Sequence, residues 1–408
     1  MRRTNLMIVQ GGGPTAVFNA SLAAIIVEAQ RQTSVARILG ARFGIKGLIH
    51  SDIADMTKMT PADLEMLRQT PGAALGSSRY SPTDGELHRL VETLRGHDVG
   101  YLLFLGGNGT MRGAEIVSGF CQSAGLDIQV VGVPKTVDND IAATDRCPGY
   151  GSAARYLAAS TRELGADLRS LPQPVTILET MGRSVGWLAA ATVLARREEG
   201  DAPHLVYVPE VPFEADNFLT ALDEVVRRNG WAVVVVAEGI RNGDGSMVYE
   251  VADAAQTDPL KRPMTGGVAQ HLAGVVSKAL GIRCRSEKPG LLARASMALV
   301  SKQDMADAAL VGRVAVQALE AGKSGVMVAL LPLGGENGAG HRLVPLGEAA
   351  GIERRIPAGW LCDGPIPVSQ EFCNYLRPLV GELDRHIAEL PTAEMRTCST
   401  TLGADPGP

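Results

Sequence analysis

The chain has 408 residues, and at about 150 residues per domain this length predicts two or three domains. Its net charge is −5 with no block of like charges, so we expect neither a nucleic acid nor a membrane as a partner. Six cysteines lack the spacing of a zinc site, which indicates free thiols in a reducing compartment. The apolar runs fall short of the ~18 residues that span a bilayer, and the run after Arg3 is too short for a secretory signal. We therefore expect a cytoplasmic protein.

Short β-branched runs alternate with longer segments of helical spacing, a pattern typical of α/β folds with buried parallel strands. The expected strands are 6–9, 101–105, 129–133, 175–178, 205–208, 231–237 and 325–331. The expected helices are 16–31, 85–95, 111–124, 150–164, 185–196, 214–228, 267–280 and 305–321. The segment 134–150 follows neither period, and a loop of that length inside a compact domain is usually functional.

Two of the early strands end in glycine-rich turns that open helices. Gly11, Gly12 and Gly13 follow the first strand, and the run 106–110 (G-G-N-G-T) follows the second. Glycine lets backbone N–H groups approach a ligand, and the helix N-terminus behind the turn favours anions. Two such turns predict a polyphosphate site, although neither matches the Walker or the classical dinucleotide pattern.

A third group of polar residues lies in the long loop. Lys135 and Thr136 precede Asp138 and Asp140 within seven residues that begin at Pro134. Two carboxylates and a lysine at this spacing offer a general base, a magnesium ligand and a cation for phosphate. An Asx-rich turn would not explain the lysine and threonine beside the acids.

These motifs and others resemble the phosphofructokinase family, in that family's order and over most of the chain. The shared motifs are G-G-N at 106–108, P-K-T-V-D-N-D at 134–140, P-G-Y-G-S-A-A at 148–154, M-G-R at 181–183, G-W at 186–187 and A-E-G at 237–239. Three more are similar to the pyrophosphate-dependent branch: G-G-G-P-T-A-V-F-N-A-S-L at 11–22, L-G-S-S-R-Y at 75–80 and Y-L-R-P-L-V-G at 375–381.

The resemblance implies a magnesium-dependent transfer of a phosphoryl group from pyrophosphate or ATP to the 1-hydroxyl of fructose 6-phosphate. Asp138 would be the base, Thr136 and Arg183 would contact the transferring group, and Asp138 with Asp140 would hold Mg²⁺. The implied donor-binding residues are Gly11, Gly12, Gly13, Arg79, Gly107, Asn108, Gly109, Thr110 and Lys135. The implied acceptor-binding residues are Met181, Gly182, Glu238, Arg285 and Arg294.

Two departures from the family pattern bear on the substrates. Gly109 is typical of the ATP-dependent enzymes, whereas Lys135 is typical of the pyrophosphate-dependent branch, so the two donor determinants disagree. Leu291 and Ala293 stand where the family usually has polar residues in the acceptor site, which should weaken or redirect acceptor binding. Whole-chain similarity favours pyrophosphate as the donor, with ATP as the alternative.

The resemblance also implies a two-domain fold with the site in the cleft between the domains. We expect residues 1–148, with 295–345 returning, to bind the donor phosphates, and residues 149–294, with 346–396, to bind the sugar phosphate. The tail 397–408 is expected to be disordered. Family members use an arginine from a neighbouring subunit, which implies a homodimer or homotetramer. A non-catalytic regulator that binds sugar phosphate is a less favoured alternative, and a dehydrogenase is less favoured still because a G-x-G-x-x-G strand turn is missing.

Overall fold

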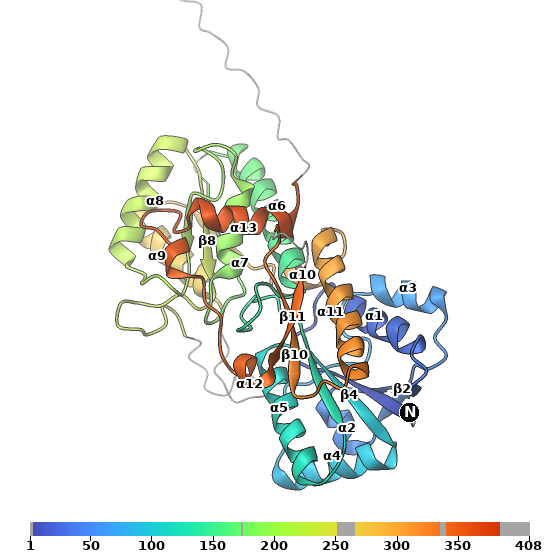
Figure 1. The fold of residues 1–408 in the computed structure, drawn as a ribbon. Helices are drawn as coiled ribbons and strands as arrows, with labels where there is room; N and C mark the ends of the chain where they lie inside the picture. The colour runs from blue at the N-terminus through green and yellow to red at the C-terminus, as the bar shows by residue number, and fades with distance from the viewer. Residues whose placement is uncertain (1–2, 173, 251–265, 335–339, 384–408) are drawn as a thin grey trace, which may run out of the picture.

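The computed structural model describes residues 3–172, 174–250, 266–334 and 340–383, in which two sheets form the centres of two bodies (Figure 1). The tail predicted at 397–408 lies outside the described residues. Both sheets are mostly parallel and flanked by helices, so the predicted fold class is confirmed. No helix within the described ranges is long and apolar enough to cross a bilayer.

The first sheet has seven strands in the order β11-β10-β5-β4-β1-β2-β3. Its strands are β1 (Thr4–Gln10), β2 (Val35–Ala41), β3 (Ile53–Asp55), β4 (Val99–Gly106), β5 (Gln129–Pro134), β10 (Val326–Leu330) and β11 (His341–Pro345). The five central strands run parallel, and only the two edge strands, β3 and β11, are antiparallel to their neighbours.

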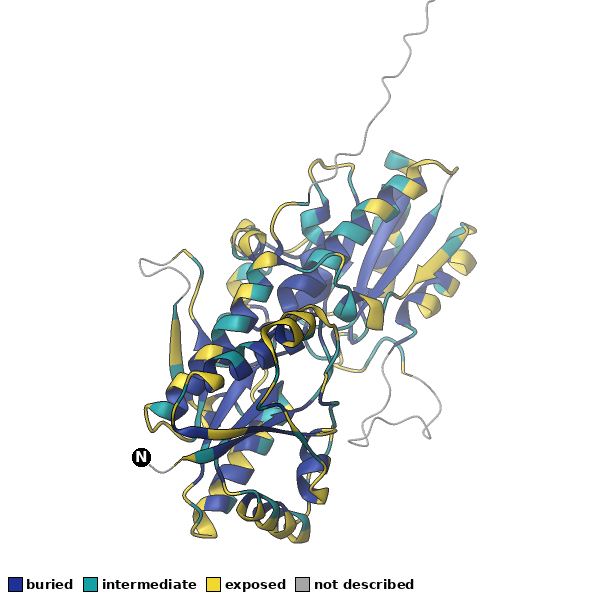
Figure 2. Cartoon of the chain, turned by 90° about the vertical axis from the view of Figure 1, so that its right-hand side faces the viewer, coloured by how far each residue is buried: buried dark blue, intermediate teal, exposed yellow. Residues whose placement is uncertain are grey.

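Helices cover both faces of the first sheet, because successive side chains of its strands point to opposite sides. On one face Leu6 and Ile8 pack with α1 (Phe18–Gln30), α3 (Pro61–Gln69) and α11 (Lys302–Glu320). On the other face Met7 and Val9 pack with α2 (Ile45–His50), α4 (Asp84–Gly96), α5 (Asn108–Ser123) and α12 (Leu346–Ala349). Figure 2 shows the buried strands between helices whose outer sides are exposed.

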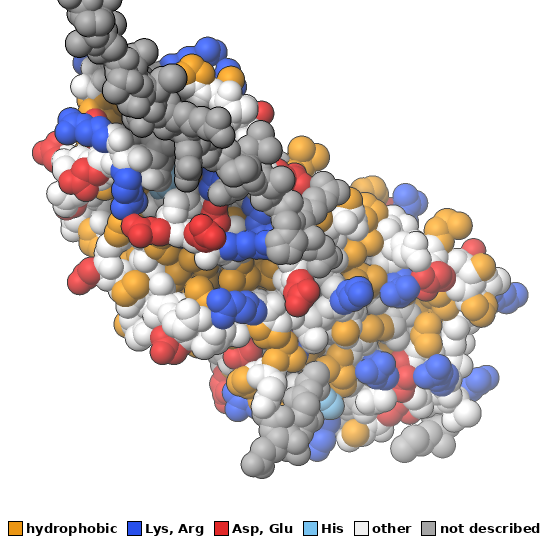
Figure 3. All heavy atoms as spheres, turned by 90° about the horizontal axis from the view of Figure 1, so that it is seen from above, with side chains coloured by type: hydrophobic (Ala, Val, Ile, Leu, Met, Phe, Trp, Pro, Cys, Tyr) orange, Lys and Arg blue, Asp and Glu red, His pale blue; other side chains and the backbone are white. Residues whose placement is uncertain are grey.

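The second sheet has four parallel strands in the order β7-β8-β6-β9. They are β6 (Val175–Thr180), β7 (Leu205–Tyr207), β8 (Ala232–Ala237) and β9 (Cys284–Glu287). The helical segments of this body are α6 (Tyr150–Arg169), α7 (Trp187–Ala191), η1 (Thr192–Ala195), α8 (Ala215–Asn229), α9 (Val268–Leu280), α10 (Leu291–Ala295), η2 (Ala358–Trp360) and α13 (Gln370–Val380). On the face in Figure 3, basic and acidic side chains are interspersed.

Several elements differ from the sequence-based expectation. The segment 185–196 forms α7 followed by a short 3₁₀ helix instead of one helix. β2 was not predicted because Arg37 and Gly40 interrupt its apolar run. Residues of α12 pack in the core of the first sheet, although 346–396 was expected with the second, because the chain folds back onto α5 directly after β11.

Candidate active site

The candidate site is a cavity of about 580 Å³ at the carboxyl ends of strands from both sheets. Residues that follow β1, β4 and β5 line one side, and residues that follow β6, β8 and β9 line the other. Ligands of open α/β sheets bind outside the carboxyl ends of the strands, where the loops point away from the core. Six such loops from two sheets therefore converge on one site.

The glycine-rich turns after β1 and β4 pack directly against each other. The Gly11 N–H donates to the Leu105 carbonyl at 2.8 Å, and the Gly12 N–H donates to the Ser78 carbonyl at 3.2 Å. A Cβ at Gly11 would lie 2.5 Å from the Thr110 Oγ1, so a larger residue would push the two turns apart. The close approach explains why glycine is needed where the backbone borders the cavity.

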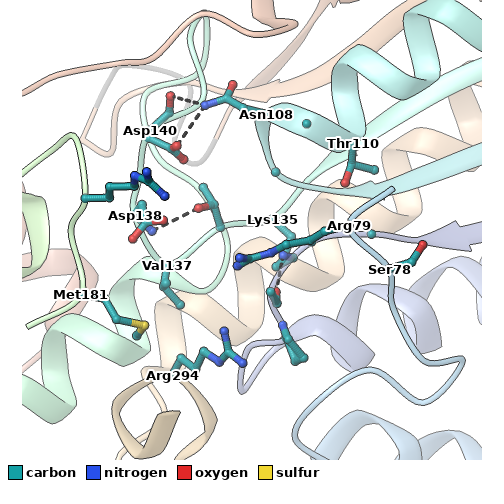
Figure 4. Close-up of a pocket in the computed structure, with 18 of the residues that line it drawn as sticks. Ser78, Arg79, Asn108, Thr110, Lys135, Val137, Asp138, Asp140, Met181 and Arg294 are labelled. Atoms are coloured by element: carbon teal, nitrogen blue, oxygen red, sulfur yellow. Dashed lines mark hydrogen bonds between the residues drawn. The ribbon is translucent and has the colours of Figure 1, made fainter. Parts of the chain in front are cut away.

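Three cationic side chains surround the first glycine turn (Figure 4). Lys135 is only 2% exposed, and its Nζ donates to the Gly13 carbonyl and lies 4.5 Å from the ring centroid of Phe18. A Cβ at Gly13 would lie 3.0 Å from the Arg294 Nη1 and 3.6 Å from the Arg79 Nη2. Three cationic side chains beside one glycine turn could together bind a highly charged anion.

Burial and crowding perturb two ionisable groups of the loop after β5. Burial, with the charges of Asp140 and Glu238, raises the pKa of Asp138 to about 7. Burial also lowers the pKa of Lys135 to about 7, although the negative charge of Asp138 opposes this shift. Carboxylates whose pKa lies near neutrality are suited to general-base catalysis, so the chemistry of Asp138 is compatible with the acceptance of a proton.

Asp140 and Asn108 offer hard oxygen ligands beside Asp138. The Asn108 Nδ2 donates to the Asp140 Oδ2 at 3.0 Å and to its carbonyl at 2.9 Å. The Oδ1 atoms of both residues are buried without a hydrogen-bond partner. The described residues contain no group of three or more His, Cys, Asp or Glu side chains that could hold a metal ion. Mg²⁺, however, typically binds only one or two carboxylates and completes its shell with water and substrate phosphates. The unpartnered oxygens therefore fit Mg²⁺.

The opposite wall of the cavity comes from the second sheet. Met181 and Arg183 follow β6, and Glu238 follows β8. Gly182 between the first two has a φ of +137°, and a Cβ there would lie 2.6 Å from the Val185 carbonyl oxygen. Gly182 does not line the cavity, but its turn points the side chains before and after it inward.

Arg285 is separated from the other predicted site residues. It lies on the edge strand β9, and its side chain lines a shallow groove beside α9 instead of the main cavity. Arg294 lies nine residues further on, after the chain has passed into α10 and reached the cavity. Every predicted site residue except Gly182 and Arg285 lines the main cavity.

Sequence reasoning missed several residues of the cavity wall. Lys288 lines it, and its Nζ lies 2.8 Å from the Oε1 of Glu179, a carboxylate that is 1% exposed. Glu353 also lines it from a segment that pairs with Ile141. Lys288 lies between Arg285 and Arg294, which the family resemblance singles out, and could have been found from that position, whereas no local pattern marks Glu353.

Two mostly parallel sheets with a polyphosphate-type site between them define an α/β phosphotransferase architecture. Residues 5–320 match the family model described as phosphofructokinase. The chain belongs to the phosphofructokinase family and is a phosphotransferase of that family.

Relatives are similar along nearly the whole chain. A pyrophosphate–fructose 6-phosphate 1-phosphotransferase of Xanthomonas campestris is 38% identical over 392 residues, covering 93% of this chain and 92% of the relative. A sulfofructose kinase of Alkalicoccus urumqiensis is 34% identical, covering 96% and 97%. The crystal structure of a pyrophosphate-dependent phosphofructokinase from Marinobacter aquaeolei has a TM-score of 0.83 at 33% identity, covering 96% and 94%.

Proposed function

We propose that this chain transfers a phosphoryl group from pyrophosphate to the 1-hydroxyl of fructose 6-phosphate or a similar sugar phosphate. The observation that carries the proposal is the buried Lys135 at the glycine turn, with Arg79 beside it. Pyrophosphate concentrates its charge on two phosphates, and the two cations at this turn match that charge better than they match the uncharged ribose and base of a nucleotide. The relatives named for pyrophosphate support the same donor.

In the proposed reaction Asp138 accepts the proton of the acceptor 1-hydroxyl. The oxygen then forms a bond to the nearer phosphorus of pyrophosphate, and the bond from that phosphorus to the bridging oxygen breaks. Phosphate leaves with the bridging oxygen, and Lys135, Arg79 and the N–H groups at the N-terminus of α5 stabilise its charge. Thr136 and Arg183 contact the transferring group, whose loose transition state needs alignment and charge neutralisation. Asp138, Asp140 and Asn108 would hold Mg²⁺, which supplies further charge neutralisation to the donor oxygens.

On the acceptor side we propose that Met181, Glu238 and Arg294 hold the sugar phosphate. Leu291 lines this wall, is 65% exposed, and offers no hydrogen bond to an acceptor. One relative at 34% identity is named for sulfofructose, a sugar with a different anionic group. The acceptor class proposed here is therefore a ketose with an anionic group at the end opposite its 1-hydroxyl.

ATP is the second candidate donor, and one observation favours it. Gly109 has no heavy atom within 4 Å of the place a Cβ would occupy, so the second glycine turn leaves open space. Ile45, Tyr80 and Gly113 also line the cavity, and the flat nucleobase of ATP could pack against them.

We also propose that the chain works as a homodimer or homotetramer. Arg285 is outside the cavity of its own chain, so a role for it in acceptor binding requires a second subunit.

Steady-state rates for each pairing of donor and acceptor test the proposed function. Pyrophosphate, ATP and GTP are each combined with fructose 6-phosphate, sulfofructose and unphosphorylated fructose in the presence of Mg²⁺. We expect the highest kcat/KM with pyrophosphate and an anionic ketose. A preference for ATP would select the second candidate, and binding of sugar phosphate without any turnover would favour a non-catalytic regulator.

A further inference from the structure

We propose that Tyr375 is a positioning residue that holds the loop of residues 134–150, the catalytic loop, through Asn139. Asn139 separates Asp138 from Asp140 and is fully buried, with a φ of +54°. A residue with a side chain is uncommon in this left-handed region, although asparagine tolerates it better than most. The directions of the two aspartates on either side therefore depend on how firmly Asn139 is held.

Hydrogen bonds fix both ends of the Asn139 amide. Its Oδ1 accepts from the Cys147 N–H at 3.0 Å, and its Nδ2 donates to the Tyr375 hydroxyl at 2.9 Å. That hydroxyl in turn donates to the Asp145 carbonyl at 2.9 Å. Burial raises the pKa of Tyr375 to about 12, so the hydroxyl keeps its proton. One hydroxyl on α13 thus joins two points of the long loop.

A second contact from the C-terminal part of the chain reaches the same loop. The Arg354 N–H donates to the Asp140 carbonyl at 2.8 Å, and its Nη1 lies 3.4 Å from the Asn139 carbonyl. The Arg354 guanidinium stacks over Trp187 at 4.3 Å and lies 5.7 Å from the Tyr375 ring centroid. Tyr375 and Arg354 both lie beyond residues 5–320, so they come from outside the part matched by the family model.

These contacts assign a role to the motif at 375–381, which the proposed reaction does not use. Tyr375 does not line the cavity and acts only through the loop. Small misplacements of reacting groups are costly in rate, so loss of this hydroxyl should lower kcat more than it alters substrate affinity. This inference rests on the proposed function only for its kinetic readout.

The test compares Tyr375→Phe with Tyr150→Phe, which removes a buried hydroxyl that donates to the Trp187 carbonyl at 3.2 Å and does not contact Asn139. With the donor and acceptor that give turnover, we expect Tyr375→Phe to lower kcat about tenfold and to change each KM less than threefold. In an Asn139→Gly background, which keeps the positive φ, the same substitution should change kcat less than about twofold. The proposal is overturned if Tyr375→Phe lowers kcat equally in both backgrounds, or if Tyr150→Phe lowers kcat as much as Tyr375→Phe does.

Hydrogen exchange gives a readout that needs no turnover. Peptides that cover 138–147 should exchange at least about tenfold faster in Tyr375→Phe than in wild type, because the loop loses its anchor. The same peptides should be unchanged in Tyr150→Phe. Unchanged exchange in Tyr375→Phe contradicts the positioning role, whereas absence of turnover in the wild type contradicts only the proposed function.

Discussion

In the proposed reaction the chemistry depends on one half-buried carboxylate, that of Asp138. It lies beside Asp140 and within the electrostatic influence of Glu238 and Lys135. Asp138→Asn keeps the shape of the side chain but cannot accept a proton, so kcat should fall by about 10² or more. Donor affinity, measured by calorimetry, should change little. If Asp138→Asn turns over at close to the wild-type rate, Asp138 is not the base.

The raised pKa of Asp138 predicts the pH dependence. The pKa is about 7, so kcat/KM should fall as the pH drops below about 7 and the carboxylate becomes protonated. The positive charge of Lys135 lowers the pKa of Asp138, and Lys135→Met should therefore move this fall to higher pH. Lys323→Met, at an exposed position, is the control and should leave the profile unchanged. A shift to lower pH in Lys135→Met would contradict the assignment.

Most of the site residues were predictable because they lie in short motifs directly after strands. Lys135, Thr136 and Asp138 are close in sequence and remain close in the cavity. Lys288 and Glu353 were not predicted, because their place in the wall depends on how distant segments pack. The position of Arg285 outside the cavity could not be predicted either, because the spacing of residues does not show where β9 ends and where α10 begins.

At the scale of elements, a buried ion pair ties α11 to the catalytic loop. The Arg146 Nε lies 2.7 Å from the Asp307 Oδ2, and the Nη2 donates to the Oδ1 at 2.8 Å. Asp307→Asn leaves the buried charge of Arg146 with only the more distant Asp145 carboxylate, 3.9 Å away, so the free energy of unfolding should fall by up to about 3–5 kcal/mol. Urea denaturation measures this loss.

A matched surface pair provides the control for this prediction. Arg37 and Asp55 form an ion pair at 2.8 Å with both side chains about half exposed, at 51% and 46%. Asp55→Asn should therefore cost at most about 1 kcal/mol. Equal losses in the two variants would show that Arg146 and Asp307 do not stabilise the loop as proposed.

Elements with a strong apolar period were predicted to within a few residues, as β8 and α1 show. The edge strands β3, β9 and β11 were missed because they are short and partly or mostly exposed, so their sequences lack a continuous apolar run. α13 was not predicted as a helix because Pro378 lies inside it, although the motif at 375–381 contributed to the family resemblance. Tertiary packing against α6 and the catalytic loop stabilises it instead.

At the scale of the whole molecule, the site exists only because two sheets direct their carboxyl ends at one cavity. The first sheet supplies the glycine turns, Lys135 and Asp138, and the second supplies Met181 and Glu238. Alternation of strands and helices predicted the fold class. It did not predict that the chain returns to the first sheet for β10 and β11, and that arrangement was expected from the family resemblance alone.

The donor is the central claim, and the change in donor preference caused by Lys135→Gly tests it most directly. The substitution removes the buried cation at the Gly13 turn and opens room beside it. We expect kcat/KM with pyrophosphate to fall at least about tenfold, or about 1.4 kcal/mol, while kcat/KM with ATP is unchanged or rises. Gly109→Asp should lower only the ATP rate, because the new carboxylate repels the α-phosphate. A wild type that prefers ATP, with any pyrophosphate activity unaffected by Lys135→Gly, would contradict the account.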